Sequence, residues 1–145
     1  AQVVADTEYG GRPQAFENMG LAAIQLGQSE DAEYAFSRAI QLNSNQIRST
    51  VELADVYLQR GNIQQADRYY QSFLTLRQFY NVQQSARSLW IGIQLEQARG
   101  MNNDMNSRLQ EYSTALADRY PNSTEYSLYQ QQLNDWYEYK WSGWK

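Results

Sequence analysis

The sequence predicts an all-α fold in which helical hairpins repeat along the chain. Residues 13–46 align with residues 47–80 after a shift of 34 positions, a period that belongs to helix–turn–helix repeats. Small, turn-forming and aromatic residues fall on matching positions of the two copies, in the pairs Gly20/Ala54, Gly27/Gly61, Ala32/Ala66, Phe36/Tyr70 and Leu42/Leu76. Because one hairpin cannot bury its apolar face alone, the copies are expected to stack as a superhelix.

The first copy has the residue types of a tetratricopeptide repeat. Its large and small residues follow that pattern at Phe16, Met19, Gly20, Ala23, Gly27, Ala32, Phe36 and Ala39. Small side chains such as Gly20 and Ala32 let the two helices of a hairpin approach closely, and aromatic rings fill the space beside them. Gly27 and Gly61 are expected to end the first helix of each hairpin. Ser29 is expected to cap the second helix of copy one.

A third, irregular copy is predicted over residues 85–121, where Pro121 stops its second helix. Asn122 or Ser123 is expected to cap a last helix that shields the end of the array, so that residues 122–145 form a capping helix and tail. Ala1–Asp6 resembles the last turn of a preceding helix. We therefore expect seven full helices in a single tetratricopeptide-repeat domain over residues 1–145.

Composition excludes several functions. The chain of 145 residues carries 12 Lys and Arg against 16 Asp and Glu, a net charge of −4, so nucleic acid is not an expected partner. No apolar run reaches the roughly 18 residues that a membrane span requires. Cys and His are both absent, which excludes thiol catalysis, Ser-His triads and the usual zinc and haem ligands.

No motif predicts an enzyme. The pattern of residues 102–106 begins like a calcium loop, but Ser107 and Ser113 stand where that loop needs Gly and Glu. The carboxylates within residues 30–33 lie at a predicted helix start, where negative charge stabilises the helix and needs no catalytic explanation. We expect no catalytic residue, no metal ligand and no cofactor.

Stacked hairpins present an inner face, made by the first helix of each copy, that suits a bound peptide or helix. Repeat positions place on this inner face Gln14, Glu17, Leu21, Ile24 and Gln25 from copy one, Arg48, Val51, Asp55, Leu58 and Gln59 from copy two, and Ala86, Leu89, Ile93, Glu96 and Gln97 from copy three. The residues predicted to bind a protein partner are Leu21, Ile24, Val51, Asp55, Leu58, Leu89, Ile93, Trp141 and Trp144. Burial of any apolar inner residue by a neighbouring repeat is an equally good interpretation.

The last ten residues carry five aromatic side chains. Trp136 and Tyr137 continue the apolar stripe of the last helix, so we expect them to fold back over the last hairpin. For Trp141 and Trp144, folding back and contact with another molecule stay equally open.

Six stretches of the sequence resemble the type IV pilus biogenesis and stability proteins, the PilF/PilW family of lipoprotein pilotins. These stretches are residues 16–21, 42–46, 52–55, 66–70, 86–89 and 119–126. They occur in order between Asp6 and Tyr129 and include positions that tetratricopeptide patterning leaves free. The chain is therefore expected to be the C-terminal part of such a protein, with further repeats and a lipid anchor upstream.

The resemblance implies a non-enzymatic assembly factor that binds protein. Pilotins of this family are lipid-anchored on the periplasmic face of the outer membrane of Gram-negative bacteria. They help the pilus secretin subunit to reach that membrane and to multimerise. Two alternatives stay open: a general peptide-binding adaptor of another complex, and the repeat arm of a larger enzyme.

Overall fold

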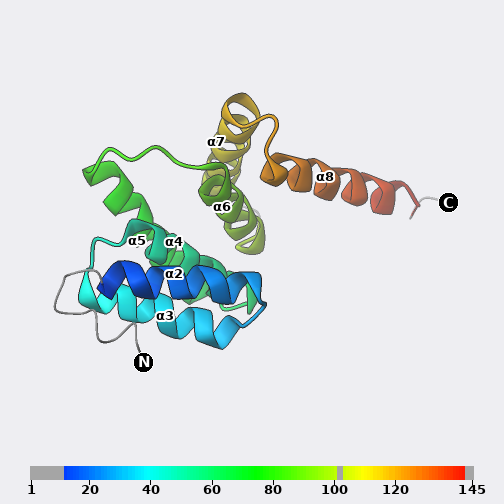
Figure 1. The fold of residues 1–145 in the computed structure, drawn as a ribbon. Coiled ribbons are helices and arrows are strands. Elements are labelled where there is room, and N and C mark those ends of the chain that lie inside the picture. The colour runs from blue at the N-terminus through cyan, green and yellow to red at the C-terminus, as the bar shows by residue number, and fades with distance from the viewer. Residues whose placement is uncertain (1–11, 101–102, 143–145) are drawn as a thin grey trace. The chain divides into compact units, whose positions relative to one another are not determined.

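The structure, a computed structural model, describes residues 12–100 and 103–142, and for residues 103–106 and 141 it describes only the backbone. These ranges contain seven α-helices joined by turns and loops (Figure 1). The helices are α2 (Arg12–Gln25), α3 (Ser29–Leu42), α4 (Ile47–Gln59), α5 (Ile63–Phe79), α6 (Ala86–Ala98), α7 (Asn103–Arg119) and α8 (Thr124–Ser142). No strand occurs in these ranges, and the predicted all-α fold is confirmed. The helical turn predicted at Ala1–Asp6 lies outside the described residues.

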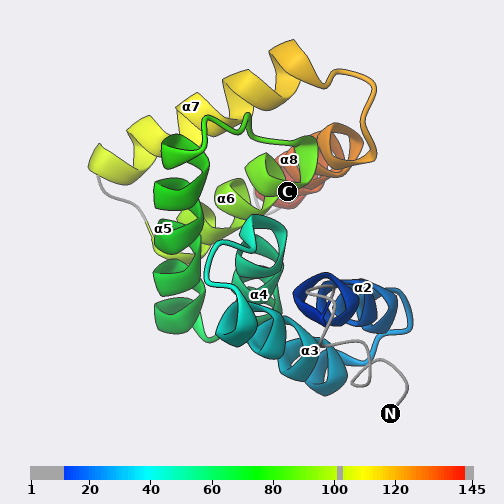
Figure 2. The same cartoon turned by 60° about the vertical axis from the view of Figure 1, so that its left-hand side comes forward.

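The chain divides between Gln83 and Gln84 into two units that each have their own packing. In the first unit, α2 packs on α3, α3 on α4, and α4 on α5, while α2 also touches α4 (Figure 2). In the second unit, α6 packs against both α7 and α8. The grouping of all residues in one domain stays a prediction.

The turns that end α2 and α4 have the same backbone structure, 34 positions apart. Gly27 and Gly61 adopt positive φ angles of 72° and 78°. The amide of Gln28 donates to the carbonyl of Ala23 at 2.9 Å, and the equivalent bond, Asn62 to Tyr57, is also 2.9 Å long. This pattern is a Schellman motif, in which the left-handed residue after the helix is usually Gly. Both predicted helix ends are confirmed.

The core of the first unit is built from the small and aromatic positions of the repeat. Gly20 lies against the ring of Phe36, and a Cβ atom at Gly20 would lie 2.5 Å from ring atom Cε1. Phe36 and Ala32 are fully buried and cluster with the side chains of Leu53 and Val56 from the second copy. One core therefore joins the two hairpins, which is what stacked repeats require.

The sequence predicts a cap at Ser29 and another at Asn122 or Ser123, and one of these two caps is present. Ser29 is the first residue of α3, and Gln28 precedes it as the N-cap without a side-chain cap. The Ser29 hydroxyl instead accepts a hydrogen bond from Nε of Arg60 at 3.1 Å, so the prediction for Ser29 is wrong. Ser123 does cap α8, because its hydroxyl accepts from the amide of Tyr126 at 3.1 Å.

Helix α8 packs on α6 near its start and exposes aromatic residues further along. The rings of Tyr129 and Trp90 meet edge to face at 6.1 Å. Beyond this contact Trp136 is 51% exposed and Tyr137 is 53% exposed, so the expectation that they fold back is wrong. On α8 itself, the ring of Trp136 contacts that of Tyr137, and the ammonium group of Lys140 lies 4.8 Å from the centroid of the Trp136 ring.

None of the helices in the described ranges combines the length and apolarity needed to cross a lipid bilayer.

Candidate functional site

The inner face of the first unit is formed by α2 and α4 and is largely polar. Leu21 and Ile24 are half-buried and pack against the core cluster, so that part of each side chain reaches solvent. Asp55 is also half-buried and accepts a hydrogen bond from the Gln59 amide at 2.9 Å. The exposed residues of the inner face are Gln14, Gln25, Arg48 and Gln59. A partner would therefore meet a glutamine-rich surface with a small aliphatic centre.

Four of the predicted partner-binding residues lie in the protein core. Val51 is 6% exposed, Leu58 9%, Leu89 2% and Ile93 0%. The apolar part of the inner face is therefore narrower than the sequence pattern indicates. The predicted binding residues of the first unit that are not buried are Leu21, Ile24 and Asp55. That any of these residues binds a partner stays a prediction.

In the third copy, α8 contacts the inner side of α6. The amides of Gln97 and Gln132 exchange two hydrogen bonds, 2.8 Å and 3.1 Å long. Ile93 and Glu96 are buried, so in copy three most inner positions face protein. The Trp141 side chain and all of Trp144 lie outside the described residues.

Glu17 occupies an inner position, but its carboxylate is directed at the start of α4. Oε1 accepts hydrogen bonds from the Ser49 amide at 3.0 Å and the Ser49 hydroxyl at 2.8 Å. The side-chain amide of Gln46 donates to the same oxygen at 3.3 Å. Glu17 is only 7% exposed, so it connects the two hairpins. The sequence did not predict this role, because the spacing of 32 residues between Glu17 and Ser49 does not match the repeat period of 34.

A second link between the hairpins joins Glu33 of α3 to α4. The Arg60 guanidinium lies 2.5 Å from Oε1 of Glu33, and the Tyr57 hydroxyl donates to Oε2 at 2.7 Å. The hydrogen bonds from Arg60 and then Tyr57 lower the pKa of Glu33 below its ordinary value, against an opposing effect of burial. The hydrogen bond to Glu33, together with burial, raises the pKa of Tyr57 to about 12. The ring of Tyr57 also stacks on the ring of Tyr69, with the two ring centroids 5.6 Å apart.

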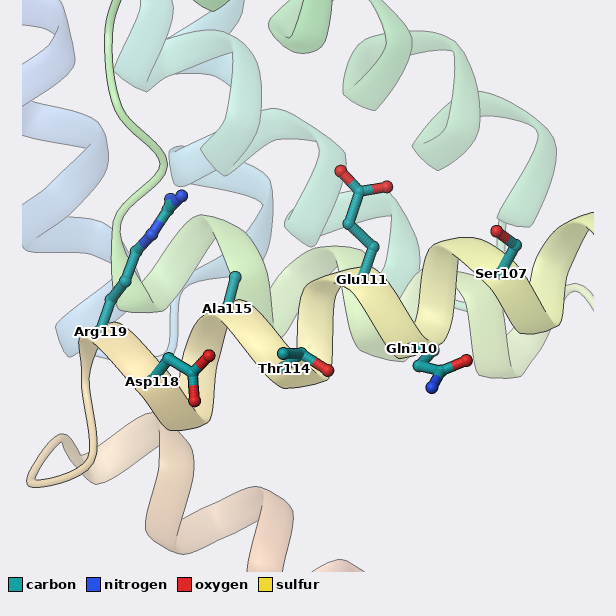
Figure 3. A pocket seen from close by; sticks show the side chains of 7 residues that line it. All are labelled: Ser107, Gln110, Glu111, Thr114, Ala115, Asp118 and Arg119. Atoms are coloured by element: carbon teal, nitrogen blue, oxygen red, sulfur yellow. The ribbon is translucent and has the colours of Figure 1, made fainter.

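Two shallow surface depressions lie along single helices of the second unit. The larger, about 460 Å³, runs along α7, where Ser107, Glu111, Ala115 and Arg119 project from one side of the helix (Figure 3). The other, about 400 Å³, follows α8 past Tyr129, Leu133 and Tyr137. All the residues that line each depression come from one helix, so neither encloses a ligand in the way that an enzyme pocket does.

Within the described residues, no three acidic, His or Cys side chains come together as a metal site. The calcium-loop pattern at residues 102–106 falls outside the side chains that the structure describes.

Known proteins share the repeats and much of the sequence of this chain. The tetratricopeptide repeat family matches residues 13–46 and 47–80, the two copies defined by the 34-residue shift. The type IV pilus assembly protein PilF of Pseudomonas aeruginosa PAO1 is 32% identical over 125 residues, which cover 86% of this chain. This chain is a tetratricopeptide-repeat protein similar to type IV pilus factors. The resemblance predicted from six sequence stretches is thereby confirmed.

Solved structures of two type IV pilus proteins have the same fold. The structure of PilF from Pseudomonas aeruginosa superposes with a TM-score of 0.73 at 31% identity, over 88% of this chain and 53% of that one. The crystal structure of PilW, a type IV pilus biogenesis factor, gives a TM-score of 0.63 at 22% identity, over 86% of this chain and 53% of that one. The chain spans about half the length of these relatives, 46% in the case of the PilF sequence.

Proposed function

We propose that this chain is part of a non-enzymatic type IV pilus assembly factor, a pilotin that supports localisation and multimerisation of the pilus secretin in the outer membrane. The observation that carries this proposal is the 32% identity to the type IV pilus assembly protein PilF over most of the chain. In the whole protein, a lipid anchor would hold the repeats at the periplasmic face of that membrane.

The accessible part of the inner face is the proposed binding surface for a secretin subunit. Its amide side chains, such as those of Gln25 and Gln59, can both donate and accept hydrogen bonds. Leu21 and Ile24 supply the apolar centre that most protein interfaces contain. Binding here needs no chemical step, which agrees with a scaffold role for stacked repeats.

In the whole protein, further repeats are proposed to pack on the surface of α2 that carries Met19 and Leu26. Leu53 of α4 is 1% exposed and belongs to the cluster that α3 helps to form. Met19, its equivalent 34 positions earlier, is 41% exposed, and Leu26 is 71% exposed. Repeat symmetry therefore favours another hairpin on this surface in the whole protein.

Co-purification of the full-length protein with its secretin tests the proposed binding surface. Gln25→Lys combined with Gln59→Lys places two charges on exposed positions of the inner face, and we expect secretin affinity to fall about tenfold or more. The matched control, Gln64→Lys with Gln78→Lys, adds the same charges to exposed positions of α5 and should bind normally. Equal affinity of both variants would reject the inner face as the binding surface.

A further inference from the structure

Helix α4 begins without a capping side chain of its own. Its N-cap residue, Gln46, makes no side-chain cap, whereas Asn62 caps α5 and Ser85 caps α6. The amide of Ser49, in the first turn of α4, is instead bound by the Glu17 carboxylate, which lies 32 residues earlier on α2. A negative group at a helix N-terminus interacts favourably with the unpaired amides and the helix dipole.

Of the two regular copies, only the first has a carboxylate at this position. A shift of 34 positions places Val51 where Glu17 stands, so the second copy cannot form the same contact. The other oxygen, Oε2, accepts from the side chain of Gln14 at 3.2 Å, which holds the carboxylate from its own helix. With Glu17 7% exposed and Ser49 fully buried, the two hydrogen bonds between Glu17 and Ser49 are shielded from water and are therefore stronger than surface bonds.

We propose that Glu17 is a positioning residue that fixes α2 against α4 and thereby sets the spacing of the two halves of the inner face. One half carries Leu21 and Ile24 on α2, and the other carries Asp55 on α4. The Glu33–Arg60 pair links α3, and not α2, to the end of α4. The distance between α2 and α4 therefore depends on other contacts. The consequence for partner binding rests on the proposed function, whereas the spacing itself does not.

A distance measurement between α2 and α4 tests the proposal without any partner. The chain has no Cys, so Gln25→Cys with Gln59→Cys, both at exposed positions, attaches two spin labels at defined sites. We expect one narrow distance distribution in the doubly labelled chain. Glu17→Ala should widen or shift this distribution while the helix content stays constant, because the first turn of α4 loses its attachment to α2.

The control is Asn18→Ala, a neighbouring exposed side chain, which should leave the distribution unchanged. A folded Glu17→Ala protein with the distribution of the unmodified sequence would overturn the proposal. If Glu17→Ala does not fold, the same measurement on Glu17→Gln decides, since glutamine keeps an acceptor oxygen but loses the charge. In that variant we expect a wider distribution and about tenfold faster hydrogen exchange at the Ser49 amide; an unchanged distribution would overturn the proposal there too.

Discussion

Gly20 shows how a missing side chain determines the crossing of two helices. A Cβ atom at this position would lie 2.5 to 2.7 Å from three atoms of the Phe36 ring, well inside normal contact distance. Phe36 is fully buried, so its ring can move only if neighbouring side chains shift with it. The contact could be predicted from the sequence because both residues belong to the repeat pattern.

Gly20→Ala should destabilise the first unit by about 1–3 kcal/mol, the usual cost of overpacking a core. The direction of the change is diagnostic, because Gly→Ala within an unobstructed helix stabilises by about 0.5–1 kcal/mol. Urea unfolding of the two proteins measures the difference. A more stable Gly20→Ala variant would show that α2 and α3 do not approach closely at this residue.

The Glu33–Tyr57–Arg60 link should make stability depend on pH at both extremes. The pKa of Tyr57 is raised from 10.0 to about 12 in the folded protein, so its contribution is complete below pH 10 and is lost as the pH rises from 10 towards 12. The pKa of Glu33 is lowered from 4.5, so its contribution is present above pH 4.5 and is lost as the pH falls through the folded value.

Melting temperatures of the chain and of Tyr57→Phe, measured between pH 8 and pH 12, isolate the tyrosine contribution. The Phe variant lacks the hydroxyl, so its melting temperature should fall less over this range than that of the unmodified chain. Parallel curves for the two proteins would contradict the hydrogen bond between Tyr57 and Glu33. Neither this link nor the Glu17–Ser49 bonds could be predicted, since their partners are 24 to 32 residues apart and follow no repeat spacing.

At the scale of helices, the turns were the most predictable feature. Gly27 and Gly61 mark the ends of α2 and α4 because a left-handed residue is needed there and glycine adopts it without strain. The start of α3 was less predictable. A serine next to a glycine turn looks like a cap, yet Ser29 is already inside the helix and bonds to Arg60 of the next hairpin.

Gly27→Ala and Gly61→Ala should each cost about 1–2 kcal/mol, since alanine is strained at positive φ. No atom lies within 4 Å of a Cβ built at either glycine, so the cost comes from the backbone alone. The two losses should therefore be equal within error when measured by urea unfolding. A large difference between them would show that the two turns are not equivalent and would contradict the 34-residue register.

The course of α8 was the least predictable element. Its aromatic stripe indicates burial along the whole helix, but α6 contacts the stripe near Tyr129 and Gln132. Further along α8, the ring of Trp136 contacts the ammonium group of Lys140 on the same helix, and half of the Trp136 side chain stays exposed. A pattern of apolar residues predicts which face of a helix is buried, but it does not predict how far along the helix its neighbour extends.

At the scale of the whole molecule, the sequence predicts the repeat type and the family more securely than the binding residues. The repeat pattern and six family stretches lead to the fold that the structure shows. Inner-face positions taken from repeat numbering include Val51 and Leu58, which are buried in the core. Repeat numbering gives the direction of a side chain, whereas its exposure depends on neighbours that the numbering does not describe.

Assembly of the pilus secretin in the living bacterium tests the central claim most directly. The gene for the full-length protein is deleted, and secretin multimers in the outer membrane are quantified with and without a plasmid copy of the gene. We predict that multimers are lost in the deletion strain and restored by the unmodified gene, but not by the gene with Gln25→Lys and Gln59→Lys. Normal secretin multimers in the outer membrane of the deletion strain would contradict the account.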